Sequence, residues 1–357
     1  MHISSSQLFQ SIEAIVKPYQ NKSKRCANPI LSIGVLNGNE RFIFGFGDLQ
    51  PFGRMSYGDL VYEIGSLTKV YTTSLLALMI EEGLIRSDDS IGQYIPSLSC
   101  DHPVKLSHLA THSSGFHAMP ILKIVRNLFD KKVRDAYCKY TLEEAITFLR
   151  SVPAHKTGKK FLYSNEGMGV LGQLLAQTLE TDYETAVMDR ICRPLGMPDT
   201  LITLSDEQRT RLVPGHGRNG EPKPELNMFD FPGTGALRST VNNQLTFMSA
   251  HLGLHPDKER CSLFSSTHQV QLRPAKSMGV GLGWMVEESD NIIWHNGSTM
   301  GFSSFMGFQK DILSGVVVLS NYRSGLLAAS PLQIGFAILK HLEERFGIPP
   351  TIADKRK

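Results

Sequence analysis

The chain has 357 residues, of which 41% are hydrophobic and 20% are charged, and its net charge is only +3. This length is typical of one large domain or two closely packed ones, and the composition is typical of a globular protein with a sizeable core. Lysine, arginine, aspartate and glutamate are interspersed, so no basic stripe indicates binding to nucleic acid or to a membrane surface.

The cysteines are scattered, odd in number and form no C-x-x-C pair. They are Cys26, Cys100, Cys138, Cys192 and Cys261. This pattern argues against a disulfide framework or a zinc site, so we expect buried free thiols.

The N-terminal stretch MHISSSQLFQSIEAIVKPYQ has the pattern of an amphipathic helix rather than that of a signal peptide. No apolar run in the chain approaches the roughly 20 residues that cross a bilayer. For the chain as written we expect a cytoplasmic protein without a transmembrane segment. If a signal peptide was trimmed before residue 1, we expect an exported one.

In chain order, the sequence begins with a helix expected over residues 7–20 and continues with two β-rich runs, 29–36 and 41–45. Between these runs, Asn37-Gly38-Asn39 is a strong signal for a hairpin turn. Further helices are expected over residues 66–82, 141–150, 167–179, 183–191, 242–252 and 331–346. Residues 214–235 contain many glycines and prolines and predict a long loop.

Short β-rich runs return near the C-terminus, over residues 281–286, 291–295, 302–308 and 315–320. Two strands from the start of the chain and three or four from its end predict one antiparallel sheet in an α/β (α+β) fold. We expect a discontinuous sheet domain of residues 1–60 and 275–357. A mostly helical domain over residues 61–274 would be inserted into it, with the active site at the junction.

Ser66 and Lys69 form an S-x-x-K pair at the start of the first long apolar helix. Residues three apart share a face of a helix, so the lysine can reach the serine hydroxyl and help to remove its proton. Ser66 would lie in the first turn, where unpaired N–H groups favour developing negative charge. Taken alone, an ordinary helix start with a solvated lysine explains this pair equally well.

Tyr163-Ser164-Asn165 is the second candidate stretch. In extended backbone the first and third residues point the same way, so the hydroxyl and the amide can face one cleft. A nearby lysine would lower the pKa of Tyr163 and make it a general base, while Asn165 would orient the substrate. Taken alone, a core tyrosine before a helix N-cap is the more ordinary explanation.

His295-Asn296-Gly297-Ser298 is the third candidate, and it closes an apolar strand. Gly297 would let a substrate approach the strand backbone closely. The N–H groups of Ser298 and Ser66 would then form an oxyanion hole. Taken alone, a hairpin turn with a surface histidine is the more ordinary explanation.

His108 and His112 are four residues apart, with His102 and His117 nearby, and such spacing can bind a metal. The stretch H-L-A-T-H lacks the glutamate of a zincin, so a structural role at a helix end is favoured. The sequence also has no G-x-S-x-G nucleophile elbow, no P-loop and no dinucleotide-binding glycine motif. We therefore expect no metal and no other cofactor.

Together and in this order, Ser66-x-x-Lys69, Tyr163-x-Asn165 and His295-x-Gly297 resemble the motifs of the serine β-lactamase and penicillin-binding protein superfamily. The resemblance is strongest to the class C β-lactamase-like branch with its D,D-peptidase and esterase relatives, whose third element is K-T-G or H-x-G. Connecting segments also match: LSHLATHSSG (106–115), YSNEGMGVLGQLL (163–175), PLGMPDT (194–200), GALRST (235–240) and GLGW (281–284).

This resemblance implies an α/β sandwich domain next to a helical domain, with an acyl-enzyme formed at Ser66. Lys69 and Tyr163 would handle the proton, and the amides of Ser66 and Ser298 would hold the oxyanion. The implied substrate-binding residues are Asn165, His295, Asn296, Gly297 and Ser298.

The third element departs from the β-lactamase pattern, because His295 and Asn296 replace a lysine and a threonine or serine. A lysine offers a permanent positive charge to a substrate carboxylate, whereas a histidine with an ordinary pKa of about 6.5 is mostly neutral at pH 7. We therefore expect an esterase or D-peptidase that acts on a small molecule or short peptide, with weak β-lactamase activity at most. The alternatives are an efficient class C β-lactamase, a penicillin-binding or sensor protein with little turnover, and acyl transfer to an acceptor other than water.

Overall fold

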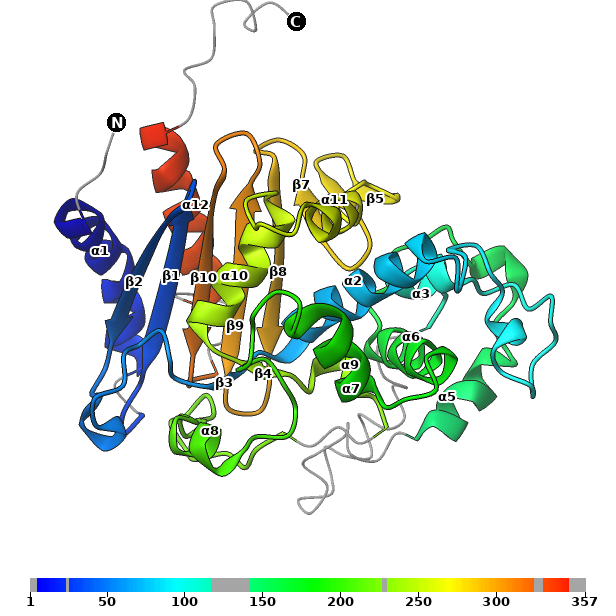
Figure 1. Cartoon of the computed structure of the whole chain (residues 1–357), viewed down its shortest axis with the longest axis horizontal. Coiled ribbons are helices and arrows are strands. Elements are labelled where there is room, and N and C mark those ends of the chain that lie inside the picture. The colour runs from blue at the N-terminus through cyan, green and yellow to red at the C-terminus, as the bar shows by residue number, and fades with distance from the viewer. Residues whose placement is uncertain (1–4, 24–25, 117–140, 227–229, 324–329, 347–357) are drawn as a thin grey trace, which may run out of the picture.

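The computed structural model describes residues 5–23, 26–116, 141–226, 230–323 and 330–346. Its centre is an eight-stranded sheet with the order β2-β1-β10-β9-β8-β7-β6-β5, shown in Figure 1. The strands are β1 (Leu31–Asn37), β2 (Glu40–Phe46), β5 (Leu272–Ala275), β6 (Met278–Val280), β7 (Met285–Glu287), β8 (Ile292–Ser298), β9 (Ser303–Gln309) and β10 (Ser314–Ser320). Every neighbouring pair is antiparallel, which confirms the predicted sheet built from both ends of the chain.

The two ends of the chain meet where β1 pairs with β10, from Leu31 opposite Ser320 to Asn37 opposite Ser314. The predicted hairpin joins β1 to β2, and Gly38 in its turn has a φ of 55°, which glycine adopts without strain. The prediction of three or four C-terminal strands was too low. The structure adds β5 and β6, and β5 carries little apolar alternation because it is an edge strand containing Pro274.

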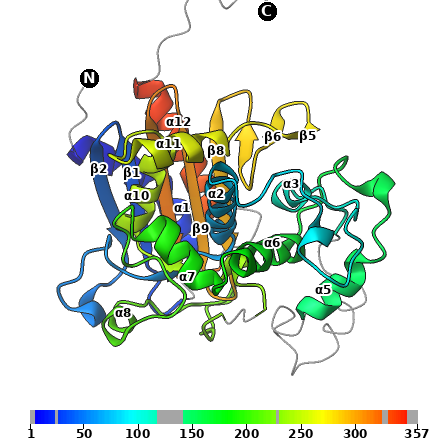
Figure 2. The same ribbon diagram turned by 45° about the vertical axis from the view of Figure 1, so that its right-hand side comes forward.

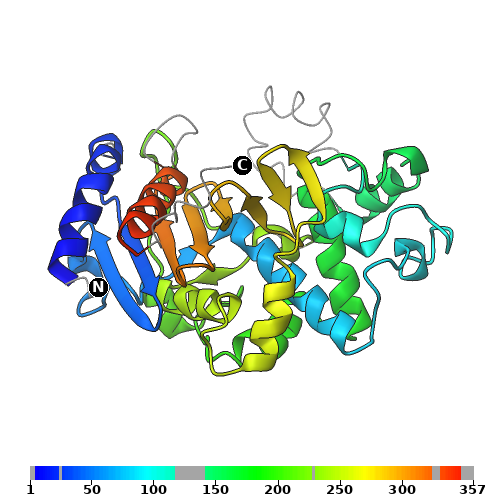
Figure 3. The same cartoon turned by 90° about the horizontal axis from the view of Figure 1, so that it is seen from above.

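Helices cover both faces of the sheet, as Figure 3 shows. On one face lie α1 (Ser5–Ser23) and α12 (Pro331–Phe346), which share an apolar cluster with β1 and β10. On the other face α10 (Val241–His251) crosses β1, followed by α11 (Lys258–Ser266). Gly34 allows this close crossing, because a Cβ there would lie 2.6 Å from Val241 Cγ1.

The remaining helices are α2 (Thr68–Glu81), α3 (Leu106–Ala110), α5 (Leu142–Leu149), α6 (Asn165–Thr178), α7 (Tyr183–Val187), α8 (Asp206–Thr210) and α9 (Pro232–Gly235). Of these, α3, α5 and α6 lie to the right in Figure 2, whereas α8 lies at the lower left. α2 is buried from Thr68 to Met79, as expected for a helix that is apolar on all sides. The exact division into a sheet domain and a helical domain stays a prediction.

Three predicted elements differ in detail. The helix expected from Ser66 begins at Thr68, because Gly65–Leu67 form a 3₁₀ turn in front of it. The helix expected over residues 183–191 changes to a π-helical turn at Met188–Cys192. The loop expected over 214–235 ends in the short helix α9. None of the described helices combines the length and apolar character needed to cross a membrane.

Candidate active site

Ser66 and Lys69 are in direct contact at the point where the chain enters α2. The Lys69 ammonium donates hydrogen bonds to Ser66 Oγ, at 2.9 Å, and to the carbonyl oxygen of Thr234, at 2.8 Å. The Lys69 side chain has no exposed surface, so the alternative of a solvated lysine is wrong. Its position follows from the three-residue spacing, since the 3₁₀ turn runs directly into the α-helix.

Burial gives Lys69 the properties of a base. It lowers the pKa of Lys69 from 10.5 to about 7, against a smaller opposing effect of the nearby Glu166 carboxylate. Burial disfavours the charged form of an amine. Near neutral pH a large fraction of Lys69 is therefore uncharged and able to accept a proton from Ser66.

Tyr163 lies between Lys69 and two histidine rings. The Lys69 ammonium is 5.1 Å from the centroid of the Tyr163 ring, and that ring is 4.4 Å from the ring of His112 and 6.2 Å from the ring of His295. The start of α6 fixes this position, because Ser164 Oγ caps the helix by accepting a hydrogen bond from an N–H in its first turn. The N-cap explanation of this stretch is thus correct, and it places Tyr163 beside the lysine as well.

Thr234 connects the first two candidate stretches and was not identified from the sequence. Its hydroxyl donates to the carbonyl oxygen of Asn165, at 2.6 Å, while its own carbonyl accepts from Lys69. The residue therefore joins α9 to both α6 and α2. The Thr234 contact with Lys69 is made by the backbone carbonyl, which every residue type has. The pattern of side chains in the sequence therefore did not identify Thr234.

His295 is buried within β8 and is not on the surface of a turn, so the hairpin-turn explanation is wrong. Its Nδ1 lies 2.7 Å from the carbonyl oxygen of Asn296, and its buried Nε2 has no hydrogen-bond partner among the described residues. Burial and the charge of Lys69 lower the pKa of His295 to about 3. The ring is therefore neutral at physiological pH, which agrees with the expectation that position 295 carries no permanent charge.

Gly297 and Gly65 let β8 pass directly against the turn that holds Ser66. A Cβ at Gly297 would lie 2.0 Å from the carbonyl oxygen of Ile64, and a Cβ at Gly65 would lie 2.8 Å from the amide nitrogen of Ser298. Ser304 on β9 also donates to that Ile64 carbonyl, at 2.7 Å. The backbones of the Ser66 turn and of residues 297–298 are thus adjacent, as an oxyanion hole made from the two chain segments requires.

These stretches open on one cavity of about 730 Å³. The polar candidates that line it are Ser66, Tyr163, Asn165, His295, Asn296 and Ser298. Its apolar lining consists of Phe161, Leu226, Met278, Met285, Trp294 and Met300. Small-molecule sites commonly combine a mostly apolar wall with a few converging polar groups.

The other histidines noted in the sequence have separate roles. His108 Nδ1 accepts from the Lys105 amide at the start of α3, and His102 Nε2 lies 3.0 Å from the carbonyl oxygen of Leu149. His117 lies outside the described residues. Within the described ranges, no group of three or more histidine, cysteine, aspartate or glutamate side chains could hold a metal ion.

His112 belongs to the site, although the sequence analysis assigned it only a structural role. It follows α3 with a φ of 55°, is buried, and its Nδ1 accepts from the Ser164 amide at 3.1 Å. Burial, Lys69 and His295 together hold the pKa of His112 well below its ordinary value. Its place in the matching segment LSHLATHSSG was the one signal that pointed to it.

Comparison with known proteins agrees with this geometry. A family model described as Beta-lactamase matches residues 13–331. The chain belongs to the beta-lactamase family. As a member, it is a serine hydrolase of beta-lactamase type, which confirms the family predicted from the three motifs.

Two curated relatives illustrate the range of this family. The D-alanyl-D-alanine-carboxypeptidase/endopeptidase AmpH of Escherichia coli (strain K12) is 27% identical over 312 residues, which cover 81% of this chain and 78% of that protein. A Beta-lactamase of Psychrobacter immobilis is 24% identical over 331 residues, which cover 82% of this chain and 79% of that protein. The relatives thus include both peptidases and β-lactamases.

Solved structures show the same fold. A class C beta-lactamase superposes with a TM-score of 0.80 at 20% identity, covering 96% of this chain and 98% of its own. The D-alanine carboxypeptidase AmpC from Burkholderia cenocepacia superposes with a TM-score of 0.77 at 22% identity, covering 95% of this chain and 100% of its own. The predicted fold class is therefore confirmed.

Proposed function

We propose that the protein hydrolyses an ester or a D-amino-acid peptide or amide through an acyl-enzyme at Ser66. The observation that carries this proposal is the buried Lys69, whose ammonium lies 2.9 Å from Ser66 Oγ and whose pKa is about 7. A serine hydroxyl becomes a useful nucleophile when a base of matched pKa is in hydrogen-bond contact.

In the acylation step, Ser66 Oγ attacks the substrate carbonyl carbon while neutral Lys69 takes the hydroxyl proton. The carbonyl oxygen becomes an oxyanion, which accepts hydrogen bonds from the amides of Ser66 and Ser298. The tetrahedral intermediate then collapses, the bond to the leaving group breaks, and the leaving group receives a proton through Tyr163.

In the deacylation step, a water molecule attacks the acyl carbon and gives up a proton through Tyr163 and Lys69. The ester bond to Ser66 Oγ breaks, the serine regains its proton, and the carboxylic acid product leaves. Asn165 and Asn296 line the cavity next to the serine, where their amides can orient the substrate by hydrogen bonds.

The neutral state of His295 favours esters and peptides over β-lactams. A lysine at this position would present a full positive charge to the carboxylate of a β-lactam, whereas the pKa of His295, lowered to about 3, leaves an uncharged ring. We therefore expect nitrocefin to be a poorer substrate than a p-nitrophenyl ester or a peptide containing D-Ala.

The test compares the wild type with Ser66→Ala, using the half-buried Ser11 of α1 as the site of a matched control, Ser11→Ala. We expect Ser66→Ala to lose hydrolysis of all three substrate types by a factor of about 10³ or more, with unchanged circular dichroism. Intact-protein mass spectrometry should show an acyl adduct on the wild type and on Ser11→Ala only.

Unchanged hydrolysis by Ser66→Ala would refute the proposal. A burst of product without steady turnover would instead support a penicillin-binding or sensor protein. Nitrocefin as by far the best substrate would show that the role given to His295 is wrong.

A further inference from the structure

Two smaller cavities adjoin the main cavity and share Arg323 with it. One has a volume of about 280 Å³ and lies against Met300, and the other, of about 260 Å³, lies against residues 296–298. Arg218 lines both of the smaller cavities. Two arginines thus line the space next to the main cavity.

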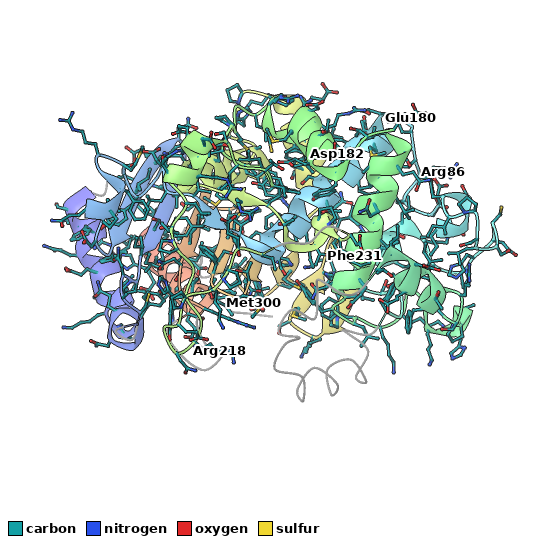
Figure 4. All side chains as sticks on the ribbon, turned by 90° about the horizontal axis from the view of Figure 1, so that it is seen from below. Arg86, Glu180, Asp182, Arg218, Phe231 and Met300 are labelled. Atoms are coloured by element: carbon teal, nitrogen blue, oxygen red, sulfur yellow. The ribbon has the colours of Figure 1, made fainter. Side chains whose placement is uncertain are left out.

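Hydrogen bonds to main-chain carbonyl groups fix the segments that carry the two arginines. The Arg323 amide donates to the carbonyl oxygen of His216, at 2.8 Å, and the His216 amide donates to that of Asn321, at 2.9 Å. The Tyr322 hydroxyl donates to the carbonyl oxygen of Arg218, at 2.7 Å. The segment after residue 214 is therefore attached to the end of β10, and Figure 4 shows Arg218 beside Met300.

The positive charge of the cavity is concentrated at this end. Among the described residues that line the main cavity, Arg323 is the one with a charged side chain at neutral pH. Lys69 lies behind Ser66 and His295 is neutral, so neither presents a permanent charge to the substrate.

Positively charged side chains outnumber carboxylates in the lining of the 280 Å³ cavity, where Arg218, Lys223 and Arg323 occur with Glu221. Glu221 also lines the 280 Å³ cavity, but it pairs with Lys223 at 2.9 Å. No carboxylate of the described residues lies within 4.0 Å of the Arg218 guanidinium. The cavity end is therefore electropositive within the part of the chain that the structure describes.

We propose that Arg218 and Arg323 form a subsite that binds a carboxylate of the substrate at a distance from the carbonyl that Ser66 attacks. Guanidinium groups present planar N–H donors that match a carboxylate, and the resulting charge-assisted hydrogen bonds are strong. The subsite supplies the charge that position 295 lacks. This inference rests on the proposed function, and it narrows the substrates to acyl compounds that carry a remote negative charge.

The test uses two pairs of esters that differ only in one charge. The first pair carries the charge on the acyl side: the 4-nitrophenyl monoesters of adipic acid and of adipamic acid. The second carries it on the leaving group: the phenylacetylglycyl esters of 3-hydroxybenzoic acid and of 3-hydroxybenzamide. For each pair, the ratio of kcat/KM for the carboxylate to that for the carboxamide measures the recognition of charge.

We expect wild-type protein to prefer the carboxylate about tenfold in at least one pair, with the preference falling as salt increases. Arg218→Gln and Arg323→Gln should each reduce the ratio, and the double variant should bring it close to one. Arg323→Lys should retain part of the preference because it keeps the charge. Arg86→Gln, on an exposed arginine far from the cavity in Figure 4, should leave the ratio unchanged.

A wild-type ratio near one in both pairs would overturn the subsite, and so would a preference that survives in the double variant. Hydrolysis of the carboxamide esters that disappears in Ser66→Ala would in that case still support the proposed function. Absence of Ser66-dependent hydrolysis of every ester would overturn both.

Discussion

Two pairs of buried histidines occupy different regions of the molecule. His112 and His295 flank Tyr163 beside the cavity. His251 is the last residue of α10 and His268 follows α11; His251 Nδ1 lies 2.9 Å from His268 Nε2, and the Trp284 ring packs against both of them. All four rings are uncharged near neutral pH, because burial lowers the pKa of each.

The difference between the pairs lies in their neighbours. The charge of Lys69 contributes to the lowered pKa of both His112 and His295, so the pKa of each ring depends on whether the candidate base is protonated. In the core pair it is the charge of Lys310 that adds to the effect of burial on the pKa of both rings, and neither ring lines the main cavity. Burial is thus the main cause that keeps all four histidines neutral, and electrostatic interaction with Lys69 is what distinguishes the pair beside the cavity.

The largest expected effect concerns Lys69 and pH. Only neutral Lys69 accepts the Ser66 proton, and its pKa is about 7. For an uncharged ester, kcat/KM should therefore fall with decreasing pH, by about 50-fold between pH 7 and pH 5, and the slope should approach tenfold per pH unit well below 7.

His295 should add no inflection in this range, because its pKa is about 3. A profile of kcat/KM from pH 5 to pH 9 tests this, with His251→Gln as the core control that should show the same inflection. A flat profile down to pH 5 would contradict the role given to Lys69.

The next largest expected effect is on kcat, and it distinguishes the two histidine pairs when one member of each is substituted. His112→Asn should reduce kcat about tenfold with little change in KM, because the ring that packs on Tyr163 is lost. Asparagine tolerates the positive φ of 55° at this position, and its side-chain oxygen can accept the Ser164 amide hydrogen.

His268→Asn is the matched core variant and should leave kcat within about twofold, although it removes the contact with His251. Steady-state kinetics at saturating ester, together with thermal melts of both variants, would separate an effect on the site from an effect on the fold. Equal losses of kcat in the two variants would contradict the distinction between the pairs.

The smallest effect concerns acid stability. The pKa of His251 is lowered from 6.5 to about 3, so between these values the unfolded chain binds a proton that the folded chain does not. Stability should fall as pH drops below about 6.5, with this histidine contributing on the order of 1 kcal/mol per pH unit. Urea titrations at pH 7.5 and pH 5.0 should show a smaller acid loss in His251→Gln than in wild type. An unchanged dependence would show that His251 is already protonated or that its ring leaves the core.

The sequence predicted the parts of the site that depend on short spacings. Ser66 and Lys69 meet because a helical turn separates them, and Asn165 begins a helix that Ser164 caps. His112 was missed because its contact with Ser164 spans 52 residues and depends on backbone with a positive φ. Such a contact arises only after tertiary packing, which local pattern does not encode.

The sequence also predicted the strands of the sheet whose apolar residues are buried. Alternating and apolar runs located β1, β2, β8, β9 and β10, since their faces pack against helices. β5 and β6 were missed because three of the four β5 residues are exposed and the strand contains Pro274. Arg323 was missed because a lone arginine after a strand has no motif, and its importance comes from the three cavities that it borders.

The strand order also determines when the site can assemble during synthesis. β1 leaves the ribosome early, yet one of its two edges stays unpaired until residues 314–320 have been made. Likewise the Ile64 carbonyl oxygen has its hydrogen bond from the Ser304 hydroxyl only after Ser304 has been made. A nascent chain that stops before β8 contains Ser66 and Lys69 but lacks the wall opposite them. The candidate nucleophile therefore acquires its surroundings only after residues 292–320 have been made, near the end of translation.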